Sequence, residues 1–158
     1  MSEVVDFKKK YKDLYPSKIE PVLIKIPEMK FVAIQGKGNP NEPDGDYQKA
    51  LEVLYGIQYT IKMSKKSTFQ IDGYFDFVVA PLEGLWWSEL DSLVSGAMTD
   101  GFDKSKFNWI SMIRLPEYVN ENVFGWAKAE VEKKKKINTE KAYLYKFDEG
   151  LCVQCLHI

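Results

Sequence analysis

The sequence predicts an α+β fold in which helices pack on an antiparallel sheet, and three observations support this. Segments 30–36 and 107–114 alternate apolar and polar side chains, as strands with one buried face do. Segments 47–63 and 120–131 carry apolar residues at spacings of three and four, which is typical of amphipathic helices. The 158 residues fit one domain and are enough to bury a sizeable core.

Composition and charge exclude several classes of partner. The chain has 22 basic and 23 acidic residues, so it has no positive surplus to neutralise a nucleic-acid backbone. It shows neither a signal peptide nor an apolar run long enough to cross a membrane, which predicts a cytoplasmic protein. We expect residues 1–20 to form a polar lead and residues 21–158 to form a single domain. The aromatic fraction of 14% predicts a large core or an aromatic-lined pocket.

The first half of the domain alternates strand and helix signals. Residues 22–36 read as an extended segment broken near Pro27, and residues 39–46 read as a loop rich in Pro, Gly and Asp. In the helix at 47–63, Ala50, Leu54, Ile57 and Ile61 form the stripe that packs on the sheet. A second stripe contains Tyr55 and Tyr59. These two residues either lie at the edge of the core with their hydroxyls in solvent, or line a cleft.

The stretch "YFDFVVAPLEGLWW" at 74–87 predicts an antiparallel pair of strands that reverses near Pro81. Successive side chains of a strand point to opposite faces, so Trp86 and Trp87 cannot both lie in one core. Without a bulge at Gly84, Trp87 shares its face with Glu83.

The second half predicts further strands and one helix. We expect only part of 88–106 to be helix or turn, a strand at 107–114, and a helix from about Asn120 seated by Val123, Ala127 and Val131. The lysines at 133–136 indicate a solvated helix end rather than a nucleic-acid or membrane patch. Two strands then follow, at 141–147 and from 150 on, joined by a tight turn at 148–150.

Standard catalytic and cofactor motifs are absent from the sequence. It lacks the glycine-rich nucleotide loops, the G-x-S-x-G serine elbow and the H-E-x-x-H zinc motif, and we expect no cofactor. The pair Cys152 and Cys155, near His157, invites a metal or redox interpretation. Because it lies in a strand pattern, where residues three apart face opposite sides, small core residues are the better interpretation. We expect no metal.

These observations lead to a pocket hypothesis in which aromatic side chains form the walls and a carboxylate supplies a polar contact. We expect the pocket to bind a hydrophobic, planar or cationic small molecule. The catalytic residues stay unassigned. The candidate ligand-binding residues are Tyr55, Tyr59, Glu83, Trp86, Trp87, Trp109, Met112 and Tyr145.

Two similar segments, "FVAIQGKG" at 31–38 and "CVQCLHI" at 152–158, suggest an internal duplication. Five stretches also resemble the GyrI-like small-molecule-binding domains, in particular a stand-alone bacterial subgroup. They are "KFVAIQGKGNPN", "YQKALEVLYGIQYTIKMS", "GYFDFVVAPLEGLWW", "WISMIRLPEYV" and "EGLCVQCLHI". The resemblance runs from about Pro21 to the end, and "PLEGLWW" with "MIRLP" is its most specific part.

The resemblance implies a pseudo-twofold fold of two β-α-β-β units of the SHS2 type, with a ligand cleft between them. Family members continue past the last strand through a loop, a helix and two more strands, so the second unit is expected to be incomplete in this chain. The buried glutamate linked to ligand binding and hydrolysis lies in that part, and no residue here is assigned its role. An apolar strand at the end of the chain would leave a sheet edge exposed. A homo-oligomer, in which a second copy covers this edge, is an alternative to an uncovered edge.

Three functions remain open at this stage. The first is a cytoplasmic binder or sensor of drug-like molecules, in which tryptophans and tyrosines stack on a planar ligand. The second, implied by the resemblance, is a hydrolase that opens the cyclopropyl ring of DNA-alkylating antibiotics and so confers resistance. In the third, the aromatic residues complete a core or an interaction surface without any ligand.

Overall fold

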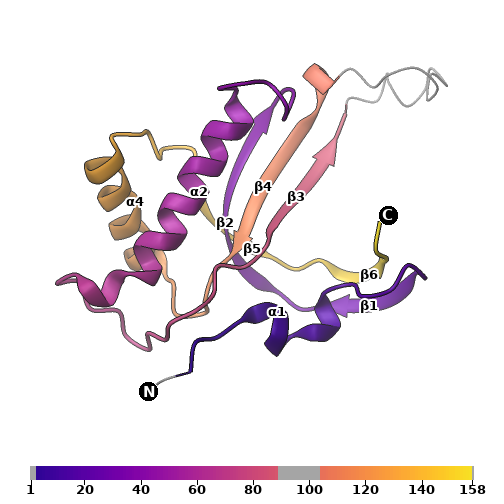
Figure 1. Ribbon diagram of the computed structural model, residues 1–158, viewed down its shortest axis with the longest axis horizontal. Helices are drawn as coiled ribbons and strands as arrows, with labels where there is room; N and C mark the ends of the chain where they lie inside the picture. The colour runs from indigo at the N-terminus through magenta and orange to yellow at the C-terminus, as the bar shows by residue number, and fades with distance from the viewer. Residues whose placement is uncertain (1–2, 89–103, 158) are drawn as a thin grey trace.

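The computed structural model describes residues 3–88 and 104–157 and confirms an α+β fold with antiparallel strands. Two helices, α2 (Asp46–Lys62) and α4 (Glu121–Lys135), lie together on one face of the main sheet (Figure 1). The strands of that sheet, in spatial order, are β3 (Leu82–Trp87), β4 (Asn108–Arg114), β2 (Met29–Lys37) and β5 (Tyr143–Phe147).

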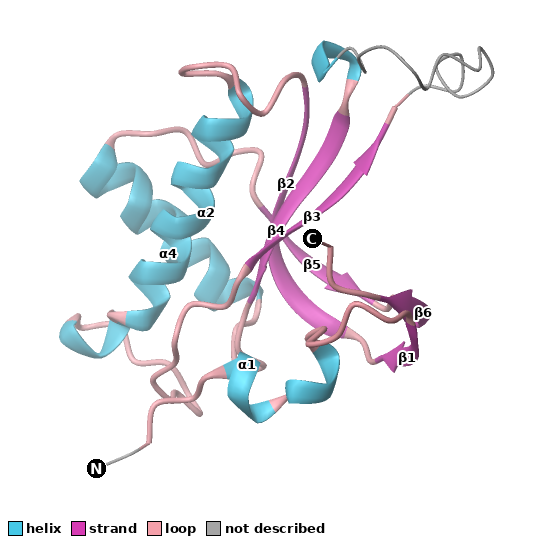
Figure 2. Cartoon of the chain, turned by 45° about the vertical axis from the view of Figure 1, so that its right-hand side comes forward, coloured by secondary structure: helices cyan, strands magenta, loops and turns pink. Residues whose placement is uncertain are grey.

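A second, two-stranded sheet is formed by β1 (Val22–Ile26) and β6 (Gly150–Gln154), which lie beyond one end of the main sheet (Figure 2). The pairing of Ile26 with Gly150 continues the register in which Met29 pairs with Phe147. The two sheets are therefore joined by one long antiparallel ladder that is interrupted around Pro27, which has no N–H to donate.

The predicted tight turn at 148–150 is wrong for this reason. The chain bends there from one sheet into the other instead of reversing, because each half of the segment pairs with a different strand. Gly150, at a φ of 70°, supplies a backbone conformation that L side chains rarely adopt.

Both helices seat on the sheet with the stripes predicted from the sequence. Ala50, Leu54, Ile57 and Ile61 are buried in α2, and α4 buries its expected apolar residues. The Oδ1 atom of Asn120 accepts a hydrogen bond from the backbone N–H of Val123 at 2.9 Å and caps α4. The lysines at 133–136 are exposed at the other end of this helix, as expected.

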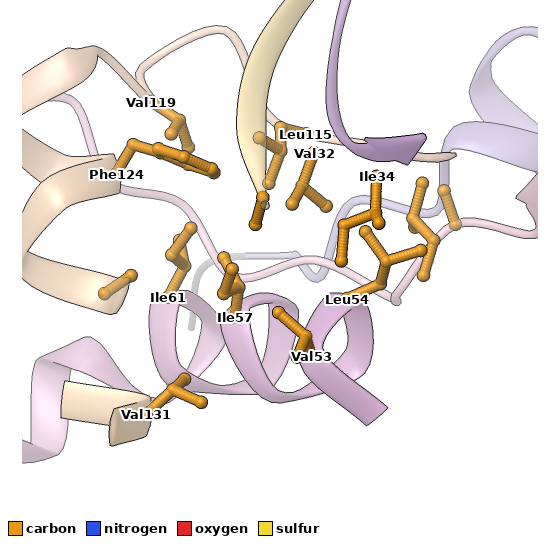
Figure 3. Packing of buried hydrophobic residues seen from close by; sticks show 14 of the residues in the cluster. Val32, Ile34, Val53, Leu54, Ile57, Ile61, Leu115, Val119, Phe124 and Val131 are labelled. Carbon is orange, nitrogen blue, oxygen red and sulfur yellow. The ribbon is translucent and has the colours of Figure 1, made fainter. Parts of the chain in front are cut away.

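The main core lies between the two helices and the sheet (Figure 3). Val32 and Ile34 of β2 point toward Leu54, Ile57 and Ile61 of α2, and all of these are nearly or fully inaccessible to solvent. A second, smaller cluster lies on the opposite face of the sheet and includes Ile26, Met29, Phe31, Ala33 and Met112.

The predicted strand at 74–81 is wrong. This segment makes only an isolated parallel bridge, from Phe77 to Val5, and β3 takes β4 as its ladder partner. Its alternating aromatic residues serve packing instead, since Phe77 is fully buried in the main core. Nζ of Lys62 holds the segment to α2 through Oδ1 of Asp76 at 2.8 Å and the carbonyl oxygen of Phe77 at 2.6 Å.

The N-terminal lead contains the short helix α1 (Phe7–Lys10) and the 3₁₀ turn η1 (Lys12–Leu14). Phe7 is 4% exposed and belongs to the main core. Two further 3₁₀ turns, η2 (Ser64–Lys66) and η3 (Lys104–Lys106), lie in loops. The predicted helix or turn within 88–106 falls mostly outside the described residues. No helix in the described part of the chain is long and apolar enough to cross a membrane.

Candidate functional site

The main sheet has a second face, turned away from α2 and α4, which we call the open face. Cross-strand pairing places Glu83, Met112, Ala33 and Tyr143 in one row across this face. Residues two positions along a strand share a face, so Leu85 and Trp87 continue the open face along β3. Phe31 and Tyr145 lie on it in the next row toward the two-stranded sheet.

A pocket of about 260 Å³ opens where the open face meets the two-stranded sheet and the N-terminal lead. This volume lies just below the usual range of small-molecule sites, which begins at about 300 Å³. Much of its wall is apolar, and its polar side chains are Tyr15, Glu83, Glu149 and Gln154. The apolar residues lining it include Leu14, Pro16, Ile26, Met29 and Cys152.

Glu83 is the perturbed carboxyl group of this pocket. Burial, followed by the nearby negative charge of Glu149, raises the pKa of Glu83 to about 6, and the positive charge of Arg114 opposes the shift only in part. Its carboxyl group accepts no hydrogen bond from any side chain that the structure describes. A carboxyl group with these properties can bind a cation or exchange a proton near neutral pH.

Tyr15 and Arg114 adjoin Glu83. Arg114 is 5% exposed, and its guanidinium carbon lies 4.6 Å from the ring centre of Phe7 and 4.5 Å from that of Tyr11. The Tyr15 hydroxyl is close enough to this guanidinium group to interact with its positive charge. Burial, and then the charge of Glu83, raise the pKa of Tyr15, so its hydroxyl keeps its proton at neutral pH.

The structure separates the predicted binding residues into two groups. Glu83, Trp87, Met112 and Tyr145 lie on the open face, and Glu83 also lines the pocket. Trp87 shares this face but stands four residues from Glu83, outside the wall of the pocket.

The other predicted residues lie on the side of the helices. The indole of Trp109 is 1% exposed and meets the ring of Tyr47 edge-on at 5.2 Å, and the indole of Trp86 lies 5.4 Å from the same ring. Tyr55 packs at the edge of the main core, and Tyr59 is 51% exposed on α2. These four residues are not brought together with Glu83, and their roles in binding stay predictions.

The divergence of the two adjacent tryptophans is confirmed. Trp86 pairs with Trp109 on the helix side, while Trp87 points to the open face, and neither indole is sealed in the interior, with exposures of 43% and 42%. The pairing of β3 with β4 runs without a bulge at Gly84.

Sequence reasoning missed Tyr15 and Arg114. Tyr15 sits in a lysine-rich lead without periodicity, so no pattern marks it. Arg114 does carry a signal, because it is the single arginine among 22 basic residues and it ends an apolar strand. Arginine is more weakly hydrated than lysine and stacks on aromatic rings, so it suits a buried position beside such rings better than lysine does.

The two cysteines lie in different environments. Cys152 is half-buried in the pocket wall and the second cluster, whereas Cys155 is exposed, so the interpretation of both as core residues is wrong for Cys155. Cys155 follows the end of β6 and has no sheet to pack on. Among the described residues, no cluster of three or more His, Cys, Asp or Glu side chains could hold a metal ion.

Comparison with known proteins gives matches among solved structures. No protein-family model and no curated protein matches the sequence. A hydrolase from Listeria innocua is 44% identical, with a TM-score of 0.84 over 99% of this chain and 71% of its own. A second structure described as a hydrolase from that organism is 44% identical, with a TM-score of 0.86 over 99% and 72%.

A third structure, of an uncharacterized conserved protein from Listeria innocua, is 43% identical, with a TM-score of 0.84 over 99% of this chain and 72% of its own. Identity at this level over nearly the whole chain establishes common ancestry as well as a common fold. The chain belongs to the same protein family as these Listeria innocua proteins.

Proposed function

We propose that the protein binds hydrophobic, planar molecules, including cationic ones, on the open face of its main sheet, with Glu83 as the polar anchor. The observation that carries the proposal is a carboxyl group whose pKa is raised to about 6 at the edge of an apolar pocket. A half-buried carboxylate without a hydrogen-bond donor is costly, and a ligand cation would relieve that cost.

The rest of the open face suits a flat ligand body. Leu85 and Trp87 follow Glu83 along β3 as partly exposed apolar side chains, and Met112 and Ala33 are buried in the cluster beneath them. Aromatic rings stack on planar ligands and attract cations through their faces. This arrangement supports the GyrI-like membership that the sequence resemblance suggests, as part of the same proposal.

Proflavine, a planar cation at pH 5–8, tests this function by fluorescence anisotropy. We expect binding that tightens as the pH rises through about 6, because Glu83 then becomes a carboxylate. Glu83→Gln should weaken binding at pH 7.5 about tenfold and remove the pH dependence. The exposed Glu52 on α2 gives the matched control, since Glu52→Gln should change neither.

Two results would count against the anchor. If the chain does not bind proflavine, the cationic part of the proposal fails. If Glu83→Gln binds it as tightly as the unaltered chain at pH 7.5, the ligand lies elsewhere, and the pocket assignment is wrong.

Hydrolysis of a small molecule is a second candidate function, favoured by the description of two relatives at 44% identity as hydrolases. The sequence resemblance narrows this candidate to opening of a cyclopropyl ring in DNA-alkylating antibiotics. The open face would orient the flat substrate, and a carboxylate would position the water that adds across the strained carbon–carbon bond.

Incubation with a cyclopropyl-bearing antibiotic, followed by mass spectrometry, tests the second candidate. A product heavier by one water molecule would support it. If Glu83 positions that water, the rate should fall in Glu83→Gln and, in the unaltered chain, as the pH drops below about 6. Binding without a ring-opened product would leave the first function and reject the second.

A further inference from the structure

Arg114 is an unusual residue in this chain. It is the single arginine in the sequence, and the protein places it at 5% exposure at the end of β4. Its Nε and Nη1 atoms are buried and have no hydrogen-bond partner in the described part of the chain. A buried cation with unused donors is costly, which suggests that the arrangement it holds has a function.

The guanidinium group fastens the N-terminal lead to the sheet. The rings of Phe7 and Tyr11 both lie within 4.6 Å of it, at distances typical of cation–π contacts. Just beyond them, the Nε2 atom of Gln154 donates to the carbonyl oxygen of Leu14 at 3.0 Å. These contacts hold the lead on the N-terminal side of Tyr15, and on its C-terminal side the carbonyl oxygen of Lys18 accepts a hydrogen bond from the backbone N–H of Leu156 at 2.9 Å.

A hydrogen bond between Arg114 and Tyr15 could have only one direction. A guanidinium group has five donors and no acceptor, so the oxygen of Tyr15 would accept such a bond from Arg114, two of whose buried donor atoms have no other partner in the described part of the chain. The O–H of Tyr15 is then directed away from Arg114 and remains available as a donor. Because Tyr15 and Glu83 line the same pocket, the pocket contains a hydroxyl donor beside a carboxyl acceptor.

We propose that Tyr15 is the hydrogen-bond donor of the pocket and that Arg114 is its positioning residue, so that the site favours planar apolar ligands carrying a carbonyl oxygen. This inference rests on the proposed binding function and adds the ligand chemistry that it selects. Glu83 cannot make the same selection in its ionised form, because a carboxylate only accepts hydrogen bonds. The raised pKa of Tyr15 agrees with this role, since the hydroxyl stays protonated at neutral pH.

Fluorenone and fluorene test the inference, because both are flat tricyclic molecules and only fluorenone has a carbonyl oxygen. Equilibrium dialysis at pH 7.5 should show about fivefold tighter binding of fluorenone, the factor expected for one added hydrogen bond. Tyr15→Phe should abolish this preference and change fluorene binding less than about twofold. Tyr47→Phe, at a tyrosine that meets Trp109 edge-on on the helix side of the sheet, is the matched control and should keep the preference.

Arg114→Lys tests the positioning role. Lysine keeps the charge but lacks the planar fork, so the preference for fluorenone should fall by at least about half. In the double variant with Tyr15→Phe, the preference should show no further loss, because both changes remove the same interaction. A purely structural role would weaken both ligands equally and leave their ratio unchanged. Thermal unfolding establishes that each variant is folded.

The outcomes separate the two proposals. If neither tricyclic molecule binds the unaltered chain, the proposed function and this inference both fail. If both bind without a preference, or if the preference survives in Tyr15→Phe, the inference alone is overturned. If Arg114→Lys keeps the full preference, Tyr15 remains the donor and the positioning role of Arg114 is rejected.

Discussion

The two faces of the main sheet contrast in how they use similar residues. On the helix face, Trp109 and Leu54 are sealed in a core formed with α2 and α4. On the open face, Glu83, Leu85 and Trp87 remain partly accessible and adjoin a pocket. The same strands supply both faces, so the difference comes from what covers them rather than from their composition.

Leucines on the two faces give the largest expected contrast in stability. Leu54 is fully buried, so Leu54→Ala should lower the free energy of unfolding by about 2–5 kcal/mol, through lost burial and a cavity. Leu85 is only half-buried, and Leu85→Ala should cost about 1 kcal/mol. Urea denaturation measures both. Equal losses would mean that the open face is as tightly packed as the core.

Two glycines provide the next contrast. A Cβ atom at Gly36 would lie 2.3 Å from the Cη2 atom of Trp109, so Gly36→Ala should destabilise the fold by about 1–3 kcal/mol. At Gly125, in α4, a Cβ atom would meet nothing within 4 Å. Gly125→Ala should therefore stabilise the protein by up to about 1 kcal/mol. Thermal unfolding reports the sign, and a neutral Gly36→Ala would show that the indole of Trp109 can move.

The charge of Glu83 should make stability depend on pH. Its pKa is about 6 in the fold against an ordinary 4.5, so the folded state binds more protons between these values, and stability falls as the pH rises through this window. Above about pH 6.5 the cost is at most about 2 kcal/mol. Glu83→Gln should therefore be more stable than the unaltered chain at pH 7.5.

Urea denaturation at pH 4 and pH 7.5 checks this expectation. At pH 4 the gain from Glu83→Gln should become small, because the carboxyl group is then mostly protonated in both the folded and the unfolded state. A gain of the same size at both pH values would point to packing rather than charge. Glu52→Gln, on the exposed side of α2, controls for a change in net charge.

The adjacent tryptophans give the smallest expected difference in stability and a clear difference in binding. Their exposures are nearly equal, but the ring of Trp86 packs against that of Tyr47 in a tilted arrangement, so Trp86→Ala should cost about 1 kcal/mol and Trp87→Ala less. Proflavine binding should weaken in Trp87→Ala only, because that indole shares the face of Glu83. If neither variant alters binding, the aromatic part of the site is wrongly placed.

Local patterns predicted the helices and most of the strands because burial on one face imposes a fixed period. The stripe from Ala50 to Ile61 and the strand ending at Arg114 follow such periods. Segment 74–81 misled the same reasoning, since its aromatic residues alternate as in a strand but pack into the core without a ladder. Hydrogen-bond partners depend on which strands meet, and a local pattern does not contain that information.

The sequence by itself determined that Trp86 and Trp87 point to opposite faces, because side-chain alternation is a property of any extended backbone. Only the tertiary structure decided which face carries the pocket. Glu83, Tyr15 and Arg114 are brought together by contacts between β3, β4 and the N-terminal lead, which are distant along the chain. Their unusual chemistry results from shared burial, and burial exists only once these segments have packed.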